Sequence, residues 1–258
     1  MKPIDLSNRF ANCKRCFEDP ATFRRDGATA LLTPWCPPRG WGGTTRAGHR
    51  ALMVVTINPG APMKGELPLY RSWGISRGNK VTKRQSTRLL SHCTQLYTEP
   101  APGPDTVFHR KIVTYVRAAL WVLGERDRVE SRNWINHVWF TDAFKCSTRS
   151  ERAPSIPKRA LEACRPHLED ELKAFTPSIV MAFGGKAREA LSAMAQADDF
   201  PPLFALPFPV NAGLKAVTAV ENDNLFESIS RVGSIGWTTA LQRSLGEFRQ
   251  ELLTTYFP

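Results

Sequence analysis

The sequence predicts an α/β protein built on a mostly parallel sheet that helices cover on both faces. Two short apolar runs, 51–57 and 178–183, have the length and composition of buried parallel strands. Each run ends abruptly at a turn that contains glycine. Segments with helical spacing of apolar residues alternate with these strands, which is the order expected of a parallel sheet with crossover helices.

The expected elements follow one another along the chain. Strands are expected at 51–57, 137–145, 178–183 and 214–220. Helices are expected at 86–97, 105–124, 158–175, 186–197 and 237–256. The 158–175 helix is expected in two pieces, because Pro166 is tolerated mainly at a first helical position. Residues 61–85 and 198–213 are expected to be loops, and the opening 45 residues an ordered or metal-organised coil.

Composition and charge restrict the class of function. With 42% hydrophobic and 23% charged residues, the chain is not expected to be disordered, collagenous or a membrane bundle. Its 35 Lys and Arg residues against 24 Asp and Glu give a net charge of +11. Such an excess indicates a polyanionic partner, nucleic acid first, although a merely soluble basic protein has the same composition.

Length and the absence of long apolar runs indicate the number of domains and the cellular compartment. The 258 residues fit one domain with loop insertions. The first ten residues lack the apolar core of a signal peptide, and no run approaches the roughly 20 residues of a membrane helix. We therefore expect a cytoplasmic monomer with no membrane partner. In that reducing compartment we expect clustered cysteines to be metal ligands or reactive thiols rather than disulfides.

Four cysteines form a candidate metal-binding set. Cys13 and Cys16 are a tight Cys-x2-Cys pair, and Cys146 and Cys164 are separated by 17 residues. Four thiolates suit tetrahedral zinc or an iron–sulfur cluster. The alternative for the second pair is simple packing, as for many buried cysteines. Cys93 is expected to pack within a helix.

Five blocks of sequence resemble the uracil-DNA glycosylase superfamily. In order they are CKRC at 13–16, TINPG at 56–60, TDAFKC at 141–146, ACRPHLEDEL at 163–172 and PSIVMAFGGKAREAL at 177–191. Their order and spacing are most similar to the thermophilic-type (family 4-like) branch that carries a [4Fe–4S] cluster. The resemblance implies a three-layer α/β/α sandwich, one glycosylase domain over 1–258 and a cluster-binding segment at 1–45. Residues 75–135 have no counterpart in the resemblance and are expected to be a helical insertion. It also implies that Cys13, Cys16, Cys146 and Cys164 hold the cluster, with zinc as the alternative.

The resemblance also implies the chemistry. Such an enzyme grips phosphates, flips a nucleotide and hydrolyses its N-glycosidic bond. Asn58 occupies the place of the water-positioning residue, in a block similar to the GINPG of the mismatch-specific branch and unlike the GEAPG of the cluster-containing branch. An asparagine orients a water but cannot take its proton, so leaving-group stabilisation carries more of the reaction. The alternative is that Asn-Pro-Gly is an ordinary turn.

Asp142 is the most informative departure from the resemblance. Uracil-specific members have asparagine at this position, whose amide pairs with uracil. An ionised aspartate only accepts hydrogen bonds, so it repels uracil O4 and suits the N4 amino group of cytosine. The alternative is a buried aspartate held by backbone donors or paired with Lys145.

The remaining contacts of a bound strand are assigned by the same resemblance. Tyr70, or its rival Trp73, would stack on the flipped base. The His-Pro-Ser loop of the family is absent, and Asn222 is a candidate replacement for its histidine, with 209–213 as a rival placement of that loop. The basic residues expected to grip DNA are Lys64, Arg71, Arg77, Lys80, Lys83 and Arg84.

These departures predict the target base. Removing unmodified cytosine from the host's own DNA would be lethal. The expected target is therefore a modified cytosine, such as the hydroxymethylated or glucosylated cytosines of phage DNA, and the expected role is antiviral defence. Uracil excision in base-excision repair is the first alternative. A non-catalytic iron–sulfur module that binds nucleic acid is the second.

Overall fold

The structure is a computed structural model that describes a defined part of the chain. The described residues are 1–15, 38, 40–43, 50–57, 59–60, 62–75, 79–98, 107–122, 132–148, 156–196, 199–201 and 203–206. Its helices are α1 (Pro3–Ala11), α5 (Glu66–Ser72), α6 (Lys83–Thr98), α7 (Val107–Val122), the 3₁₀ helix η2 (Arg132–His137), α9 (Lys158–Phe175) and α10 (Gly185–Ser192). Its strands are β1 (Gly42–Gly43), β2 (Arg50–Thr56), β3 (Val138–Asp142), β4 (Pro177–Phe183) and β5 (Leu203–Leu206).

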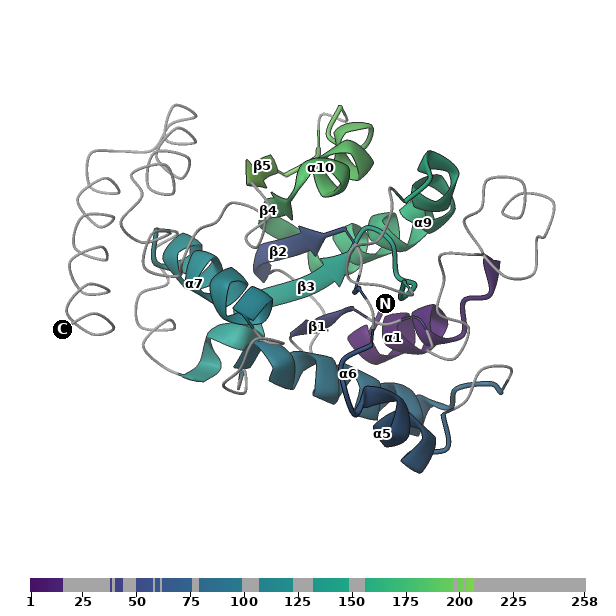
Figure 1. The fold of residues 1–258 in the computed structure, drawn as a ribbon. Coiled ribbons are helices and arrows are strands. Elements are labelled where there is room, and N and C mark those ends of the chain that lie inside the picture. The colour runs from purple at the N-terminus through teal and green to yellow at the C-terminus, as the bar shows by residue number, and fades with distance from the viewer. Residues whose placement is uncertain are drawn as a thin grey trace.

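The described strands form one sheet in the order β1-β3-β2-β4-β5. The four longer strands are parallel, and only β1 runs antiparallel, along β3. The arrows of β2 and β3 run side by side in the same direction in Figure 1. The prediction of a mostly parallel α/β sheet is therefore confirmed.

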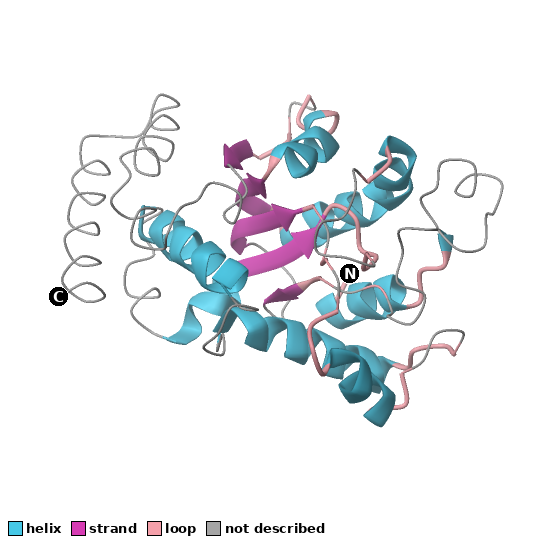
Figure 2. Ribbon diagram, in the orientation of Figure 1, coloured by secondary structure: helices cyan, strands magenta, loops and turns pink. Residues whose placement is uncertain are grey.

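Helices cover both faces of this sheet, as Figure 2 shows. Successive side chains along a strand point to opposite faces of the sheet, so two neighbouring residues of β3 show which helix covers each face. The Trp139 ring stacks on Phe175 of α9 with centroids 4.2 Å apart, and the Phe140 ring stacks on Tyr97 of α6 at 3.8 Å. Every residue of β3 is buried, as expected of a central strand of a parallel sheet.

Several predicted elements are present with changed bounds. The strand predicted at 51–57 is β2, that at 178–183 is β4, and the helices predicted at 86–97 and 105–124 are α6 and α7. The strand predicted at 137–145 is shorter, because His137 ends η2 and β3 ends at Asp142. The helix predicted at 186–197 ends at Ser192. The elements predicted at 214–220 and 237–256 lie outside the described residues.

Pro166 does not divide α9, and the prediction of two pieces was wrong. The helix is continuous over 18 residues with Pro166 inside it. A proline removes one backbone donor, whereas α9 buries a whole face against the sheet, and that packing outweighs one lost hydrogen bond. The buried residues of this face are Ala160, Leu161, Cys164, His167, Leu168, Glu171, Ala174 and Phe175.

Three described elements lie in segments predicted to be irregular. The N-terminal coil contains α1, which packs by its buried Leu6 and Phe10, and Asn12 exchanges hydrogen bonds of 2.8 Å with the backbone of Val81. The loop predicted at 61–85 contains α5, and that at 198–213 contains β5. Each is nine residues long or less, too short for a clear periodic pattern.

Candidate functional site

Thr56 and Asp142 meet at the carboxyl ends of two adjacent parallel strands. They are register partners at the last paired position of β2 and β3, so their side chains leave the same face of the sheet. The Thr56 hydroxyl donates to Oδ1 of Asp142, and both residues are 3% exposed. Ligands of open α/β sheets bind outside the carboxyl ends of the strands, so this edge is the candidate site.

The loops that follow these strands are held together by backbone hydrogen bonds. The amides of Ala143 and Phe144 donate to the carbonyls of Thr56 and Ile57 at 2.8 and 2.9 Å. Farther on, the Thr148 amide donates to the carbonyl of Gly60 at 3.1 Å. Asn58 itself lies outside the described residues, but the backbone on both sides of it is fixed against the loop after β3.

Gly40 covers the second oxygen of the Asp142 carboxylate. A methyl group built on Gly40 would lie 1.7 Å from Oδ2 of Asp142 and 2.9 Å from the ring of Pro59. The glycine has φ +94°, a conformation that side chains disfavour. A residue without a side chain is therefore required where this segment crosses the aspartate.

A buried ion pair lies directly beneath Asp142. Lys145 Nζ contacts Oε2 of Glu171 on α9 at 2.7 Å, with the side chains 1% and 0% exposed. The ammonium also donates to the Asp142 carbonyl at 2.8 Å and to the Thr141 hydroxyl. Lys145 therefore donates to the Asp142 backbone, and its positive charge is paired with the Glu171 carboxylate. The ion pair is thus not the Lys145–Asp142 pair of the predicted alternative.

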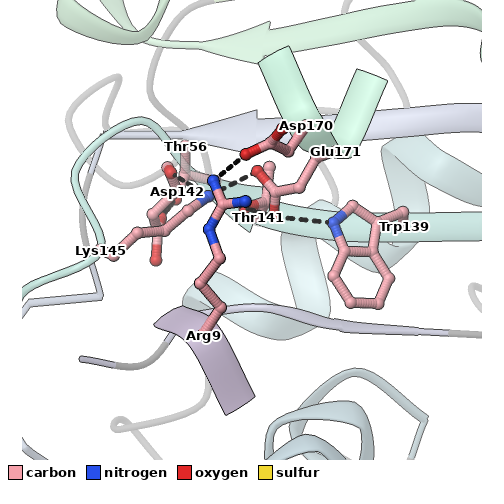
Figure 3. Close-up of polar contacts among 8 residues, drawn as sticks. All are labelled: Arg9, Thr56, Trp139, Thr141, Asp142, Lys145, Asp170 and Glu171. Carbon is pink, nitrogen blue, oxygen red and sulfur yellow. Dashed lines mark hydrogen bonds and ion pairs between the residues drawn. The ribbon is translucent and has the colours of Figure 1, made fainter. Parts of the chain in front are cut away.

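Glu171 completes this network with its second oxygen. Oε1 accepts from Trp139 Nε1 at 3.0 Å and from Thr141 Oγ1 at 2.7 Å, as Figure 3 shows. The Phe10 ring of α1 lies 5.1 Å from Lys145 Nζ, which places an aromatic ring at cation–π distance. A buried charge pair is tolerated when its remaining donors and acceptors are satisfied in this way.

The predicted cluster ligands fall on three separate segments. Cys13 follows α1, Cys146 follows β3 and Cys164 lies on α9, and the last two are 4% and 3% exposed. Cys16 lies outside the described residues. Within the part of the chain that the structure describes, no three His, Cys, Asp or Glu side chains are arranged to hold one metal ion.

His167 is an additional buried group beside Cys13. Its Nε2 lies 3.3 Å from Cys13 Sγ, whereas Nδ1 has no hydrogen-bond partner. Burial, and next the positive charge of Lys145, lowers the pKa of His167 to about 3, so the imidazole is neutral at physiological pH. Burial also raises the pKa of the Cys13 thiol, a backbone hydrogen bond at Arg15 opposes this, and the nearby Cys164 raises it further.

Tyr70, which was predicted to stack on the flipped base, lies in the core. The side chain is 1% exposed, and its hydroxyl donates to Oε1 of Glu66 at 2.7 Å. Its ring packs against Trp73 and His92 at centroid distances of 5.8 and 5.9 Å. The half-buried Trp73, its rival, retains partial exposure.

The basic residues predicted to bind DNA are distributed over α5, α6 and the segments before them. Lys64, Arg71, Lys80, Lys83 and Arg84 are all exposed. Lys83 and Arg84 begin α6 and do not lie in a loop. The Lys83 ammonium lies 2.8 Å from the Asp5 carboxylate, so part of its charge is neutralised. Arg77 and Asn222 lie outside the described residues.

Sequence reasoning missed four residues that shape this site: Thr56, Gly40, Glu171 and His167. Glu171 had a usable signal, because Leu168, Glu171 and Phe175 follow the i, i+3, i+7 spacing of one helix face. Thr56 stands where the similar GINPG block has glycine, which by itself indicates no contact with Asp142. The contact of Gly40 with Asp142 joins positions about a hundred residues apart, and no local pattern indicates it.

Comparison with known proteins assigns the family. The model of the uracil DNA glycosylase superfamily matches residues 89–232, which is more than half of the chain and includes β3, Asp142, Lys145 and α9. No curated protein matches the chain. No helix among the described residues is long and apolar enough to cross a membrane. The chain belongs to the uracil DNA glycosylase superfamily, whose members hydrolyse N-glycosyl bonds in DNA.

Proposed function

We propose that this glycosylase excises a modified cytosine, such as hydroxymethylated or glucosylated cytosine of phage DNA, and that it acts in antiviral defence. The observation that carries the proposal is Asp142, buried at the carboxyl end of β3 with Oδ1 bonded to the Thr56 hydroxyl. A hydroxyl donor satisfies a carboxylate acceptor, which matches the ionised form of the side chain.

An ionised Asp142 selects among bases by hydrogen-bond polarity. It only accepts, so it complements the N4 amino group of cytosine and opposes the lone pairs of uracil O4. In a buried site the mismatch is costly, because neither group recovers the hydrogen bonds it loses from water. Asp142 is 3% exposed, and Gly40 lies against its Oδ2.

Bond cleavage is assigned to the loop after β2. The glycosidic bond breaks with positive charge on the sugar and negative charge on the departing base. Asn58 would orient a water toward the sugar carbon, and the fixed backbone at Ile57 and Gly60 supports that placement. Because an asparagine takes no proton, most of the rate enhancement would come from preorganised groups around the base.

One panel of oligonucleotides tests the target base. The protein is incubated with DNA containing uracil, cytosine, 5-hydroxymethylcytosine or its glucosylated form, and alkali then cleaves the abasic sites. We expect cleavage at a modified cytosine and none at cytosine. Asp142→Asn should shift activity toward uracil, because an amide both donates and accepts. Cleavage by the wild type at uracil alone would refute the proposal in favour of uracil repair.

We further propose that Cys13, Cys16, Cys146 and Cys164 hold a [4Fe–4S] cluster. Cys164 contributes to the raised pKa of the Cys13 thiol, so the two cysteines lie near each other, and the basic side chains of Arg15 and Arg9 lie near Cys13. Each iron of such a cluster takes a different thiolate, so its ligands need not converge on one point. The donor set thus fits the group, which would tie the N-terminal segment to β3 and α9.

A further inference from the structure

A surface depression lies between α5 and α6. Apart from Trp73, the rival candidate for stacking on the flipped base, its lining residues have no role assigned in excision. Its volume is about 450 Å³, within the roughly 300–1,000 Å³ of small-molecule sites. Six residues line it: Leu69, Trp73, Arg88, Ser91, His92 and Gln95. None of these six is acidic, and they supply aromatic rings, a cation and neutral hydrogen-bonding groups.

The α6 wall of the depression follows from helical spacing. Arg88, Ser91, His92 and Gln95 stand at i, i+3, i+4 and i+7, so they share one face of the helix. Arg88, Ser91 and Gln95 are exposed, and His92 is half-buried. This face therefore presents its polar groups outward and is not part of the core.

The aromatic wall is held rigidly. Gln85 of α6 donates to the carbonyls of Trp73 and Gly74 at 3.1 and 3.0 Å, which anchors the end of α5. The Trp73 and His92 rings meet edge to face with centroids 5.9 Å apart. Beneath them Glu66, 3% exposed, lies 3.3 Å from His92 Nε2. An aromatic ring fixed in place loses little conformational freedom when a base stacks on it.

The surroundings of the depression are basic. Arg84 lies one helical turn before Arg88, and Lys64 and Arg71 are exposed at the two ends of α5. The nearby carboxylate of Glu66 is turned inward, where it accepts from the Met63 amide at 2.6 Å. The positive charges around the opening of the depression therefore favour binding of a phosphate.

We infer that this depression binds one unpaired nucleotide of the DNA strand, other than the nucleotide whose base is excised. Its base stacks on Trp73, its phosphate lies at Arg88, and Ser91 and Gln95 contact its polar edge. Aromatic stacking beside a cation is how proteins hold single-stranded nucleic acid without reading its sequence. The inference rests on the DNA substrate of the family and is independent of which base is removed.

Binding measurements separate stacking from general charge. Fluorescence anisotropy is used with single-stranded DNA of about 12 nucleotides that contains only the four ordinary bases, and with an abasic strand of the same length. Trp73→Leu should weaken binding of the ordinary strand roughly tenfold and leave the abasic strand unchanged. Arg88→Gln should weaken both strands and lower the salt slope by about 0.7.

Matched substitutions elsewhere control for folding and charge. Arg188→Gln and Ser192→Glu make the same changes at exposed positions of α10, whereas Ser91→Glu places a negative charge inside the depression. We expect Ser91→Glu to weaken binding several-fold more than Ser192→Glu. Equal effects of the two glutamates, or a Trp73→Leu loss that is the same on both strands, would overturn the inference. Because no target base is present, failure here leaves the excision proposal untouched.

Discussion

Lys145 and Glu171 form an ion pair that is almost fully removed from solvent, 2.7 Å apart and 1% and 0% exposed. The pair joins the loop after β3 to α9, and the same ammonium binds the carbonyl of Asp142 at 2.8 Å. Asp170, the residue before Glu171, pairs with Arg9 at the surface, where the side chains of Asp170 and Arg9 are 26% and 39% exposed. Figure 3 shows both pairs.

Glu171→Gln should destabilise the protein by about 3 kcal/mol. The substitution keeps the shape but leaves the Lys145 ammonium without its counter-charge in a buried site, where breaking an ion pair costs about 3–5 kcal/mol. Urea unfolding followed by circular dichroism measures the change. Excision should fall as well, because Lys145 loses the counter-charge that holds it in place to donate to the Asp142 carbonyl.

Asp170→Asn is the control for this prediction. It makes the same change of charge one residue earlier on the same helix, but its pair with Arg9 is exposed, and such pairs contribute about 1 kcal/mol or less. Equal losses of stability in the two variants would show that the burial of Glu171 has no special energetic consequence.

Thr56→Val should reduce excision at least about tenfold with a smaller effect on folding. Valine has nearly the shape of threonine but no hydroxyl, so Oδ1 of Asp142 loses its donor, and a hydrogen bond to a charged group contributes about 1.5–3 kcal/mol. Single-turnover excision of the preferred base measures the effect. Thr56→Ser keeps the hydroxyl and should retain most activity; if serine fails as badly as valine, the methyl group and not the hydrogen bond matters.

The sequence predicted the long elements because they carry a repeated pattern. The strands β2 and β4 are apolar runs, and α6, α7 and α9 each extend over 16 residues or more. By contrast, α5 has 7 residues and β5 has 4, so neither repeats its pattern often enough to be recognised. Continuous α9 was missed because the helix-breaking tendency of Pro166 is local, and the burial that overrides it is tertiary.

Sequence reasoning proposed site residues where one residue type suggests the chemistry, and it missed the contacts between distant segments. Asp142 was singled out by the family resemblance and by the acceptor-only nature of a carboxylate, and the structure places it at the end of β3. The partners of Asp142 and Lys145 come from β2 and α9, and only the folded chain brings them together. Tyr70 bonds to Glu66, only four residues earlier on α5, and its ring also packs against His92 of α6, a contact that no local pattern indicates.

Gly40→Ala should impair excision through Asp142. The new methyl group would lie 1.7 Å from Oδ2, so the carboxylate has to turn away from its present position. Gly65→Ala is a matched control, because Gly65 has φ +92° against +94° for Gly40 and nothing within 4 Å of its added methyl group. Both variants should lose about 1–2 kcal/mol of stability from backbone strain. Only Gly40→Ala should lose activity, and equal activity in the two variants would contradict a close contact with Asp142.

Cys146→Ser should abolish the colour of the purified protein. If four thiolates hold an iron–sulfur cluster, protein isolated without oxygen is brown, and loss of one ligand removes the broad visible absorption together with most of the bound iron. Cys93→Ser is the control, since Cys93 is equally buried, at 3% exposed, but lies on α6 among packing residues. The Cys93 variant should keep both iron and colour. A colourless wild type that contains one zinc per chain would replace the cluster by a tetrahedral zinc site.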